Sequence, residues 1–229
     1  MNGHLVTPAT NRIRTACAAT LALAAALTLT ACGSSQPHHP GTADQVVSRP
    51  AGSSPYKGTE LSKPFAKPAL VLTGADGQPF DLRERTAGRT VLLFFGYSSC
   101  PDVCPTTMGD VAVALGKQPQ EIRDNTQVVF VTTDPERDTP AALDKWLDAF
   151  SPSFIGLSGN LEQVKKAAIG VGIAIEDPKK HHDGSVTSDH GAQVLAFTPD
   201  GEGRVVYTSG TTVDDFTHDL PLLAKNTRS

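Results

Sequence analysis

The sequence predicts an α/β fold in which a mixed β-sheet is flanked by helices. Two continuous apolar runs, residues 91–95 (VLLFF) and 128–132 (VVFVT), have the length and residue types of strands buried on both faces. A helical pattern follows each run, and a hairpin pattern and a final helix close the chain. Parallel strands that alternate with helices, followed by an antiparallel hairpin, are typical of an α/β sandwich.

The elements follow one another from residue 68. The turn signal GADGQ separates two short apolar runs in residues 68–82, which predicts an N-terminal β-hairpin. The buried strand 91–95 leads to a helix that contains MGDVAVAL, with Thr106 and Thr107 near its start. After the second buried strand, Thr139 as N-cap and Pro140 at the first position predict another helix.

The second half of the chain continues the alternation. The segment LEQVKKAAIGVG places Val164 and Ala168 on one helical side, and glycines follow it. Residues 175–189 form a polar loop, PDGEG joins the two strands of a hairpin, and TTVDDFTHDLPLLAK is a closing helix. This order of elements is that of a thioredoxin-like architecture, with one domain and no internal repeat.

The first 31 residues have the pattern of an export signal. Arg12 and Arg14 precede the apolar, uncharged run TACAATLALAAALTLTAC, which is typical of a secretory signal peptide. The run is short for a membrane-spanning helix. A retained membrane anchor is an alternative, and it would leave the rest of the chain on the same side of the membrane.

This segment ends in LTAC, which resembles the bacterial lipobox. We therefore expect residues 1–31 to be a lipoprotein signal peptide and Cys32 to carry a lipid as the new N-terminus. An ordinary signal peptide with a cysteine at this place is the alternative. Residues 32–62 are rich in Gly, Ser and Pro and predict a flexible tether, and residues 63–229 predict the folded domain.

The composition is that of a globular protein, with 39% hydrophobic and 19% charged residues. Removal of residues 1–31 takes away two arginines and no acid, which changes the formal net charge of −4 to −6. The chain has no basic patch and no glycine-rich phosphate loop. Nucleic acid is therefore not expected as a partner.

The cysteines point to chemistry rather than to a structural disulfide. Cys17 leaves with the predicted signal and Cys32 takes the lipid, so that Cys100 and Cys104 remain in the folded domain. A disulfide stabilises most when it closes a long loop, and this loop is short. We expect redox chemistry or metal binding from this pair.

The segment GYSSCPDVCP places the pair after a buried strand and at the start of a helix. Sites in α/β sheets lie at this edge, and the amides of a helix N-terminus are expected to lower the pKa of a thiol. Pro101 and Pro105 stiffen the turn. Two thiolates in a stiff turn suit Cu(I), which prefers soft ligands, and a reversible disulfide stays open as the alternative.

A metal site needs a further ligand. The histidines of the predicted domain are His181, His182, His190 and His218. His190 directly precedes the strand AQVLAF and follows the long polar loop, which can bring it over the cysteine turn. Copper accepts two thiolates and an imidazole in both of its oxidation states.

Three segments, GYSSCPDVCP, VTTDPERDTP and SDHGAQVLAFTPDG, occur in this order. Together they resemble the Sco/SenC family of thioredoxin-like copper-binding proteins, over residues 63 to the C-terminus. The resemblance implies a copper site, Cu(I) or Cu(II), formed by Cys100, Cys104 and His190. One departure concerns Gly191, because the family often has Ser or Thr after the histidine.

The resemblance also implies a place and a partner. Family members are tethered to the membrane and face its outer, extracytoplasmic side. They help to build the dinuclear copper centre of cytochrome c oxidase, so the expected partner is the oxidase subunit that carries this centre.

Two functions are open. The first is a copper metallochaperone, which binds and hands over copper without turnover. The second is a thiol–disulfide reductase in which Cys100 and Cys104 are the catalytic redox pair, acting on cysteines of the oxidase copper site or on other exported proteins. A peroxidase would need an arginine beside its cysteine, and no arginine lies near Cys100 in the sequence.

Several nearby side chains have structural readings. Asp102 is expected to cap the helix, Asp134 to form a turn or to tune the site, and Tyr97 to pack beside the site without binding metal. We expect Asp138, with Thr139, to begin the next helix. His181 and His182 are expected to be solvated loop residues or to assist copper capture.

Overall fold

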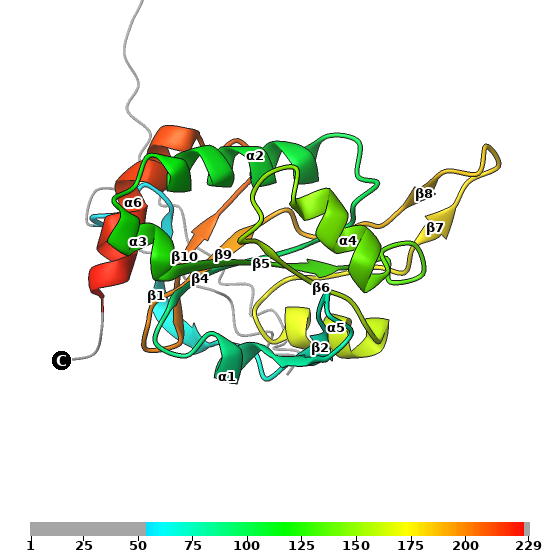
Figure 1. Ribbon diagram of the computed structural model, residues 1–229, viewed down its shortest axis with the longest axis horizontal. Helices are drawn as coiled ribbons and strands as arrows, with labels where there is room; N and C mark the ends of the chain where they lie inside the picture. The colour runs from blue at the N-terminus through cyan, green and yellow to red at the C-terminus, as the bar shows by residue number, and fades with distance from the viewer. Residues whose placement is uncertain (1–53, 227–229) are drawn as a thin grey trace, which may run out of the picture. The chain divides into compact units, whose positions relative to one another are not determined.

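The structure, a computed structural model, describes residues 54–226. The predicted signal peptide and the expected lipid attachment site Cys32 lie outside the described residues. The described part confirms the predicted α/β fold, with one six-stranded mixed sheet in the order β1–β10–β9–β4–β5–β6 (Figure 1). These strands are β1 (Thr59–Ala66), β4 (Thr90–Gly96), β5 (Thr126–Thr132), β6 (Ile155–Leu157), β9 (Val194–Phe197) and β10 (Glu202–Tyr207).

The sheet combines parallel and antiparallel pairs. Strands β4, β5 and β6 are parallel neighbours, as the helical connections between them require. Strand β9 runs antiparallel to β4, and β10 and β1 continue this antiparallel half. The sheet order places β9, a strand from late in the chain, directly beside β4, which ends at the cysteine turn.

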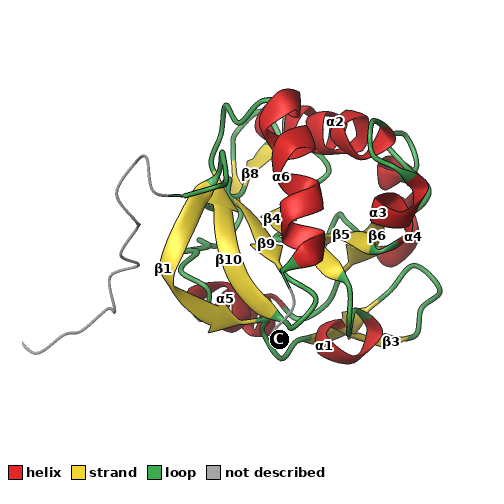
Figure 2. Ribbon diagram, turned by 90° about the vertical axis from the view of Figure 1, so that its left-hand side faces the viewer, coloured by secondary structure: helices red, strands yellow, loops and turns green. Residues whose placement is uncertain are grey.

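The two faces of the sheet carry separate apolar clusters, because successive residues of a strand point to opposite faces. In β4, Leu92 and Phe94 face one cluster, and Leu93 and Phe95 face the other. Helices α2 (Val103–Gly116), α4 (Pro140–Leu147) and α6 (Val213–Lys225) cover the first face. The second face is covered by α5 (Leu161–Ile169) together with α1 (Leu82–Arg85) and the hairpin of β2 (Val71–Thr73) and β3 (Pro79–Asp81) (Figures 1 and 2).

Local sequence signals explain where several elements begin. The hairpin β2–β3 confirms the expected N-terminal hairpin, although it forms a small sheet of its own. Thr139 caps α4, since its hydroxyl accepts from the backbone N–H of Ala142 at 3.3 Å, and Pro140 is the first helical residue. A short helix that the sequence did not predict, α3 (Gln120–Asp124), follows α2.

Three strand regions were also not predicted. Strand β1 begins at Thr59, four residues before the expected start of the domain, and pairs with β10 at the sheet edge. Its pairing shifts register between Glu60 and Phe65, where Pro64 lies, as is common for proline in edge strands. The short β6 is the other edge, and β7 (Lys179–Lys180) and β8 (Val186–Thr187) form a hairpin within the expected polar loop. This hairpin projects from the sheet (Figure 1).

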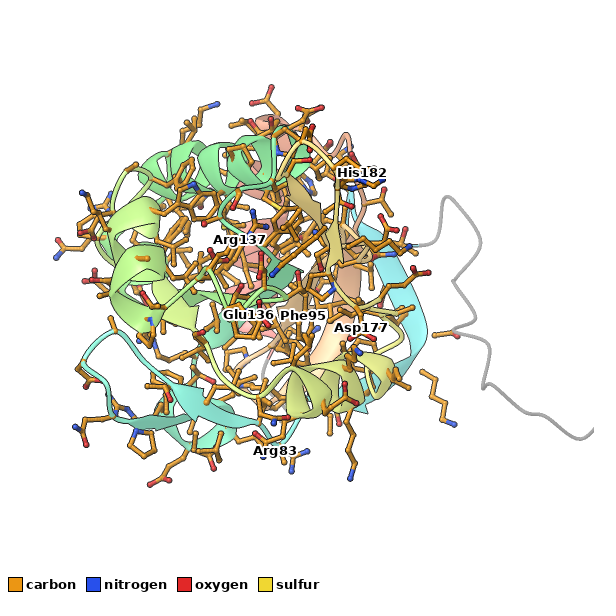
Figure 3. The ribbon with its side chains drawn as sticks, turned by 90° about the vertical axis from the view of Figure 1, so that its right-hand side faces the viewer. Arg83, Phe95, Glu136, Arg137, Asp177 and His182 are labelled. Atoms are coloured by element: carbon orange, nitrogen blue, oxygen red, sulfur yellow. The ribbon has the colours of Figure 1, made fainter. Side chains whose placement is uncertain are left out.

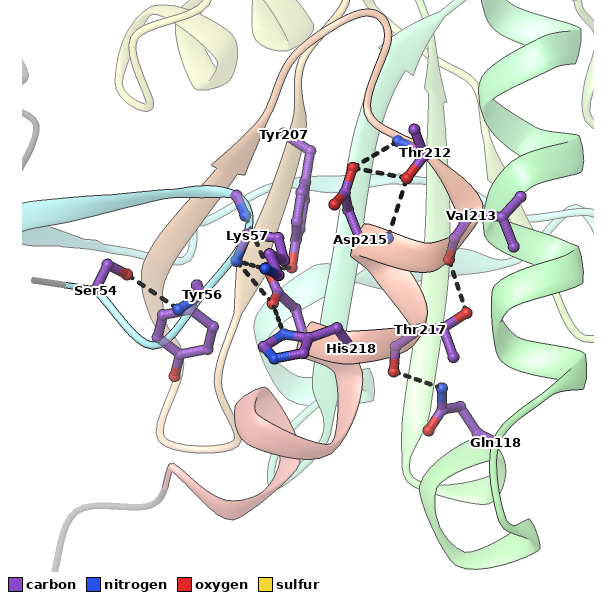
Figure 4. A network of polar contacts seen from close by, with 12 residues as sticks. Ser54, Tyr56, Lys57, Gln118, Tyr207, Thr212, Val213, Asp215, Thr217 and His218 are labelled. Carbon is purple, nitrogen blue, oxygen red and sulfur yellow. Dashed lines mark hydrogen bonds and ion pairs between the residues drawn. The ribbon is translucent and has the colours of Figure 1, made fainter. Parts of the chain in front are cut away.

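A buried carboxylate on α6 anchors the segment that directly precedes β1. Asp219 has no exposed surface, and it accepts hydrogen bonds from the backbone N–H groups of Lys57 and Gly58, each at 2.9 Å. It also accepts from the hydroxyl of Tyr207 at 3.0 Å and contacts His218 Nδ1 at 2.7 Å (Figure 4). This network holds the segment before β1 against the closing helix.

Within residues 54–226, no helix is both long enough and apolar enough to cross a membrane.

Candidate metal centre

The two cysteines lie where strand β4 passes into helix α2. Cys100 is in the connecting turn and is half-buried, whereas Cys104 is in the first turn of α2 and has no exposed surface. Both are free thiols. The backbone N–H of Cys104 donates to Cys100 Sγ at 3.4 Å. The sulfur of Cys100 therefore faces the N-terminus of helix α2.

His190 reaches this turn from the other half of the chain. Its Nε2 lies 3.8 Å from Cys104 Sγ, although 86 positions separate the two residues. The other ring nitrogen, Nδ1, lies 3.1 Å from the carbonyl oxygen of Gly191. A carbonyl can only accept, so Nδ1 carries the hydrogen and neutral Nε2 presents its lone pair toward the sulfur.

Two aromatic rings hold the imidazole of His190. Phe94 and Tyr97 each meet it edge to face, with ring centroids 5.9 Å and 5.8 Å away and interplanar angles of 86° and 89°. Both rings belong to the end of β4 and the residue after it. The strand that leads to the cysteines therefore also orients the histidine, and Tyr97 packs beside the site as expected.

Burial controls the charge of the site without metal. Burial raises the pKa of the Cys104 thiol, and the neighbouring Cys100 and Asp138 raise it further. The expectation that the helix N-terminus lowers this pKa is therefore wrong for Cys104, because desolvation of the thiolate outweighs the amides. Burial also lowers the pKa of His190, so the imidazole is neutral at neutral pH. A metal ion held by Cys104 would have to displace the thiol proton.

The segment between β5 and α4 lies behind the cysteine turn. Asp134 and Asp138 are both buried. The carboxylate of Asp134 pairs with Arg137, which also donates to the carbonyl of Val186 in β8 at 3.3 Å. Figure 3 shows the side of the molecule on which Arg137 lies. Asp134 also forms the expected turn, because its carbonyl accepts from the N–H groups of Arg137 and Asp138.

Two structural expectations need correction. Asp138 does not serve as a helix start: Thr139 is the N-cap, and the carboxylate of Asp138 instead accepts from Ser98 in the cysteine turn. Asp102 occupies the N-cap position of α2 but makes no capping hydrogen bond with its side chain. The hydroxyl of Thr106 lies 3.5 Å from Asp102 Oδ1, which makes at most a weak hydrogen bond. Nothing in the neighbouring sequence distinguishes these two aspartates from aspartates that do cap a helix.

The other predicted side chains lie farther from the cysteines. His181 and His182 are exposed on the β7–β8 hairpin, and His181 Nε2 lies 3.0 Å from Thr187 Oγ1. Among the described residues, no group of three or more His, Cys, Asp or Glu is already arranged to hold a metal ion. Cys104 and His190 are thus brought together, and Cys100 lies beside Cys104.

The turn opens onto a cavity of about 370 Å³. Asp102 and Val103, which stand between the two cysteines, line it together with Thr106 and Asp110 of α2. The loop from β10 to α6 forms the opposite wall. The lining includes neither cysteine nor His190, so the part of the turn that this cavity exposes is Asp102 and Val103.

The donor set fits a soft metal ion. Two sulfurs and one imidazole suit copper in either oxidation state, whereas hard cations such as Mg²⁺ and Ca²⁺ prefer oxygen ligands. The carbonyl of Gly191 would keep Nε2 of His190 free for the metal by holding the proton on Nδ1, as is common for metal-bound histidines.

The SCO1/SenC family model matches residues 58–225. The chain belongs to the SCO1/SenC family. It is 34% identical over 168 residues to a protein of Stutzerimonas stutzeri named as a putative copper-binding protein, with 73% of this chain and 81% of that protein covered. The mitochondrial proteins SCO1 and SCO2 of Saccharomyces cerevisiae are also relatives. Both are longer, and the chain spans about half of their length.

Solved structures of the SCO1/SenC family share this fold. Apo Sco1 of Thermus thermophilus is 36% identical, with a TM-score of 0.65, and the match covers 73% of this chain and 96% of that one. ScoI of Bradyrhizobium japonicum, solved with copper bound, is 30% identical, with a TM-score of 0.61, and the match covers 69% of this chain and 99% of that one. The thioredoxin-like expectation for the fold is confirmed.

Proposed function

We propose that this protein is a membrane-anchored copper metallochaperone that delivers copper for the dinuclear copper centre of cytochrome c oxidase. Cys100, Cys104 and His190 bind the copper ion, which is cargo rather than a permanent cofactor. The observation that carries this proposal is the approach of His190 Nε2 to within 3.8 Å of Cys104 Sγ. Membership of the SCO1/SenC family and a copper-bound relative support the choice of metal.

Each ligand has a separate task in capture and release. Cys100 is half-buried in the turn beside the open cavity, so we infer that it receives the ion first. Cys104 then loses its proton and His190 closes the site with Nε2. Release to the acceptor reverses this order: His190 leaves the ion first, Cys104 leaves next, and a ligand of the acceptor replaces Cys100 last.

The proposal includes an anchor and a side of the membrane. The lipid on Cys32 holds the protein to the cell membrane, and residues 32–62 let the domain reach the oxidase subunit that carries the copper centre. The domain faces the extracytoplasmic side, where that centre is assembled. The lipobox-like LTAC and the apolar segment before it support this part.

A thiol–disulfide reductase is the second candidate function. The observation that favours it is the pair of free thiols, with Cys100 Sγ only 3.4 Å from the backbone nitrogen of Cys104. Cys100 would attack a partner disulfide and Cys104 would resolve the mixed disulfide. This activity needs both cysteines and does not need His190.

Copper titration of the reduced protein tests the proposal. We expect one Cu(I) per chain in the wild type, and His190→Ala should lower the affinity by more than about a hundredfold, since a lost ligand costs more than a lost supporting contact. His182→Ala is the matched control, because His182 is exposed on the neighbouring hairpin. Equal affinities of the wild type and H190A would exclude the three-ligand site. No copper binding, together with rapid reduction of a disulfide substrate, would favour the reductase.

A further inference from the structure

A buried aspartate lies behind the cysteine turn and has no ionic partner among its hydrogen bonds. Asp138 is only 1% exposed. Its carboxylate accepts from the backbone N–H of Ser98 at 2.9 Å, from the hydroxyl of the same residue, and from Thr132 Oγ1 at 2.6 Å. Ser98 stands two positions before Cys100, so these bonds tie the beginning of the cysteine turn to the end of β5.

The backbone of Asp138 is held just as firmly. Its N–H donates to the carbonyl of Asp134 at 3.0 Å, and its carbonyl accepts from the hydroxyl of Ser158, after β6, at 2.7 Å. The carboxylate therefore cannot follow the turn if the turn moves. A buried carboxylate that accepts three hydrogen bonds is an effective restraint, because losing any donor leaves charge without compensation.

The same segment holds the histidine side of the site through Thr133. Thr133 has no exposed surface, and its N–H donates to the carbonyl of Gly96 at the end of β4, at 2.7 Å. Its hydroxyl accepts from Ser188 Oγ at 2.8 Å. Ser188 is buried and stands two positions before His190, so this contact sets where the histidine loop begins.

We propose that Asp138 and Thr133 are the positioning residues of the metal site. Asp138 holds the cysteine turn and Thr133 holds the histidine loop, both from the single segment 133–138 after β5. Neither residue touches the metal. The inference rests on the proposed function, because it assumes that the two halves bind one ion.

Asp138 and Thr133 affect different properties of the site. Asp138 acts on the thiols, so its loss changes how readily Cys100 and Cys104 form a disulfide. Thr133 acts on the imidazole, so its loss changes copper affinity and leaves the thiols unaffected. A residue with a purely structural role would lower the stability of the fold without separating these two properties.

The variants are Asp138→Asn, Thr133→Val and Asp219→Asn, made in a chain whose Cys17 and Cys32 are serine, so that Cys100 and Cys104 are its only thiols. D219N is the matched control, since Asp219 is a buried carboxylate whose hydrogen bonds go to Lys57, Gly58 and Tyr207 and not to the cysteine turn. Thr133→Ser keeps the hydroxyl and serves as the rescue variant.

Two measurements require no copper. In the first, the protein equilibrates with glutathione: the two thiols lose two electrons and two protons to oxidised glutathione, giving the protein disulfide and two reduced glutathione molecules. D138N should favour the disulfide by about fivefold, since the loss of one hydrogen bond of ordinary strength loosens the dithiol turn. In the second, NMR of the apo protein should show shifted His190 imidazole signals in T133V.

The third measurement is Cu(I) affinity by competition with a chromophoric chelator. T133V should lower the affinity by about tenfold and T133S should restore it, as expected for residues that orient a metal ligand. The disulfide equilibrium of T133V should stay within about twofold of the wild type, and D219N should match the wild type in all three measurements, because neither change reaches the thiols.

Clear outcomes overturn the proposal. If D138N changes the disulfide equilibrium no more than D219N does, Asp138 does not position the thiols. If T133V leaves the His190 signals in place, Thr133 does not position the histidine. Should D138N fail to fold, Ser98→Ala removes the hydroxyl contact from the turn side and takes its place. A wild type that binds no copper refutes the proposed function, while the two apo measurements still decide the positioning roles.

Discussion

Gly96 lies directly against the sulfur of Cys104. A Cβ atom at Gly96 would come within 3.0 Å of Cys104 Sγ, 2.9 Å of a Phe130 ring carbon and 2.7 Å of a Phe94 ring carbon. The last residue of β4 therefore has no room for a side chain. The position of Cys104 depends on this close approach of backbone to thiol.

Gly96→Ala should destabilise the fold by about 1–3 kcal/mol, the usual cost of adding a methyl group to a well-packed core. It should also weaken copper binding, because the methyl group displaces Cys104 Sγ from His190. Urea unfolding and Cu(I) competition measure the two effects. Gly109→Ala is the control, since a Cβ at Gly109 meets no atom within 4 Å. An unchanged affinity in G96A would show that Cys104 tolerates displacement.

The two thiols should differ in reactivity. Cys104 has no exposed surface and its pKa is raised by burial, so little thiolate is available at neutral pH. With Cys17 and Cys32 replaced, Cys104→Ser, which keeps Cys100, should react with iodoacetamide at least about tenfold faster than Cys100→Ser, because the thiolate is the nucleophile. In urea the two variants should react at similar rates. Equal rates in the folded protein would contradict the burial of Cys104.

Lys67 should make stability depend on alkaline pH. Its ammonium group is buried and donates to the carbonyl and hydroxyl of Thr86 at 3.0 and 2.8 Å. Burial, assisted by the charge of Arg83, lowers the pKa of Lys67 from 10.5 to about 8. Between these pH values the unfolded chain binds more protons than the folded one, so the free energy of unfolding rises as the pH increases from about 8 to about 10.5.

Lys67→Met removes this titration, and its stability should vary less with pH over the same interval. Urea unfolding at several pH values gives the comparison, with the exposed Lys145→Met of α4 as the control. Parallel pH profiles of the wild type and K67M would show that Lys67 keeps an ordinary pKa in the folded protein.

Asp219 should anchor the segment that enters the domain. Asp219→Asn weakens the acceptor for Lys57, Gly58 and Tyr207, and the expected destabilisation is about 2–3 kcal/mol, as for a hydrogen-bonded buried charge. Hydrogen exchange should show faster exchange of the Lys57 and Gly58 amides. If these two amides exchange at wild-type rates in D219N, the network of Figure 4 does not hold the segment.

The central part of the fold was predictable because its signals are local and strong. The apolar runs in β4 and β5 have residues buried on both faces, and such strands appear in the sequence as continuous hydrophobic segments. The position of Cys100 just after β4 follows from the order of residues in the chain. The place of His190 directly before a strand predicts that it can reach the site, and the pairing of β9 with β4 accounts for its approach to Cys104.

The edge strand β1 escaped prediction because it buries little. In β1 only Leu61 is buried, and Pro64 interrupts the pattern, so the segment has the composition of a tether. The roles of Asp138 and Thr133 depend on partners 40 and 55 positions away, and no local pattern records such partners. The pKa of Cys104 is raised, whereas the sequence predicts a lowered pKa. The reason is that desolvation depends on packing, which the sequence does not display.

The sheet order determines when, during synthesis of the chain, the histidine can join the two cysteines. Strand β9 lies between β10 and β4 in the sheet and follows His190 in the sequence, so the imidazole can join the thiols only after most of the polypeptide has been made. A truncated chain that ends before residue 190 retains both cysteines and lacks the third donor. In the proposed site, three-ligand capture is therefore restricted to chains that include residue 190, and shorter chains offer the ion two donors.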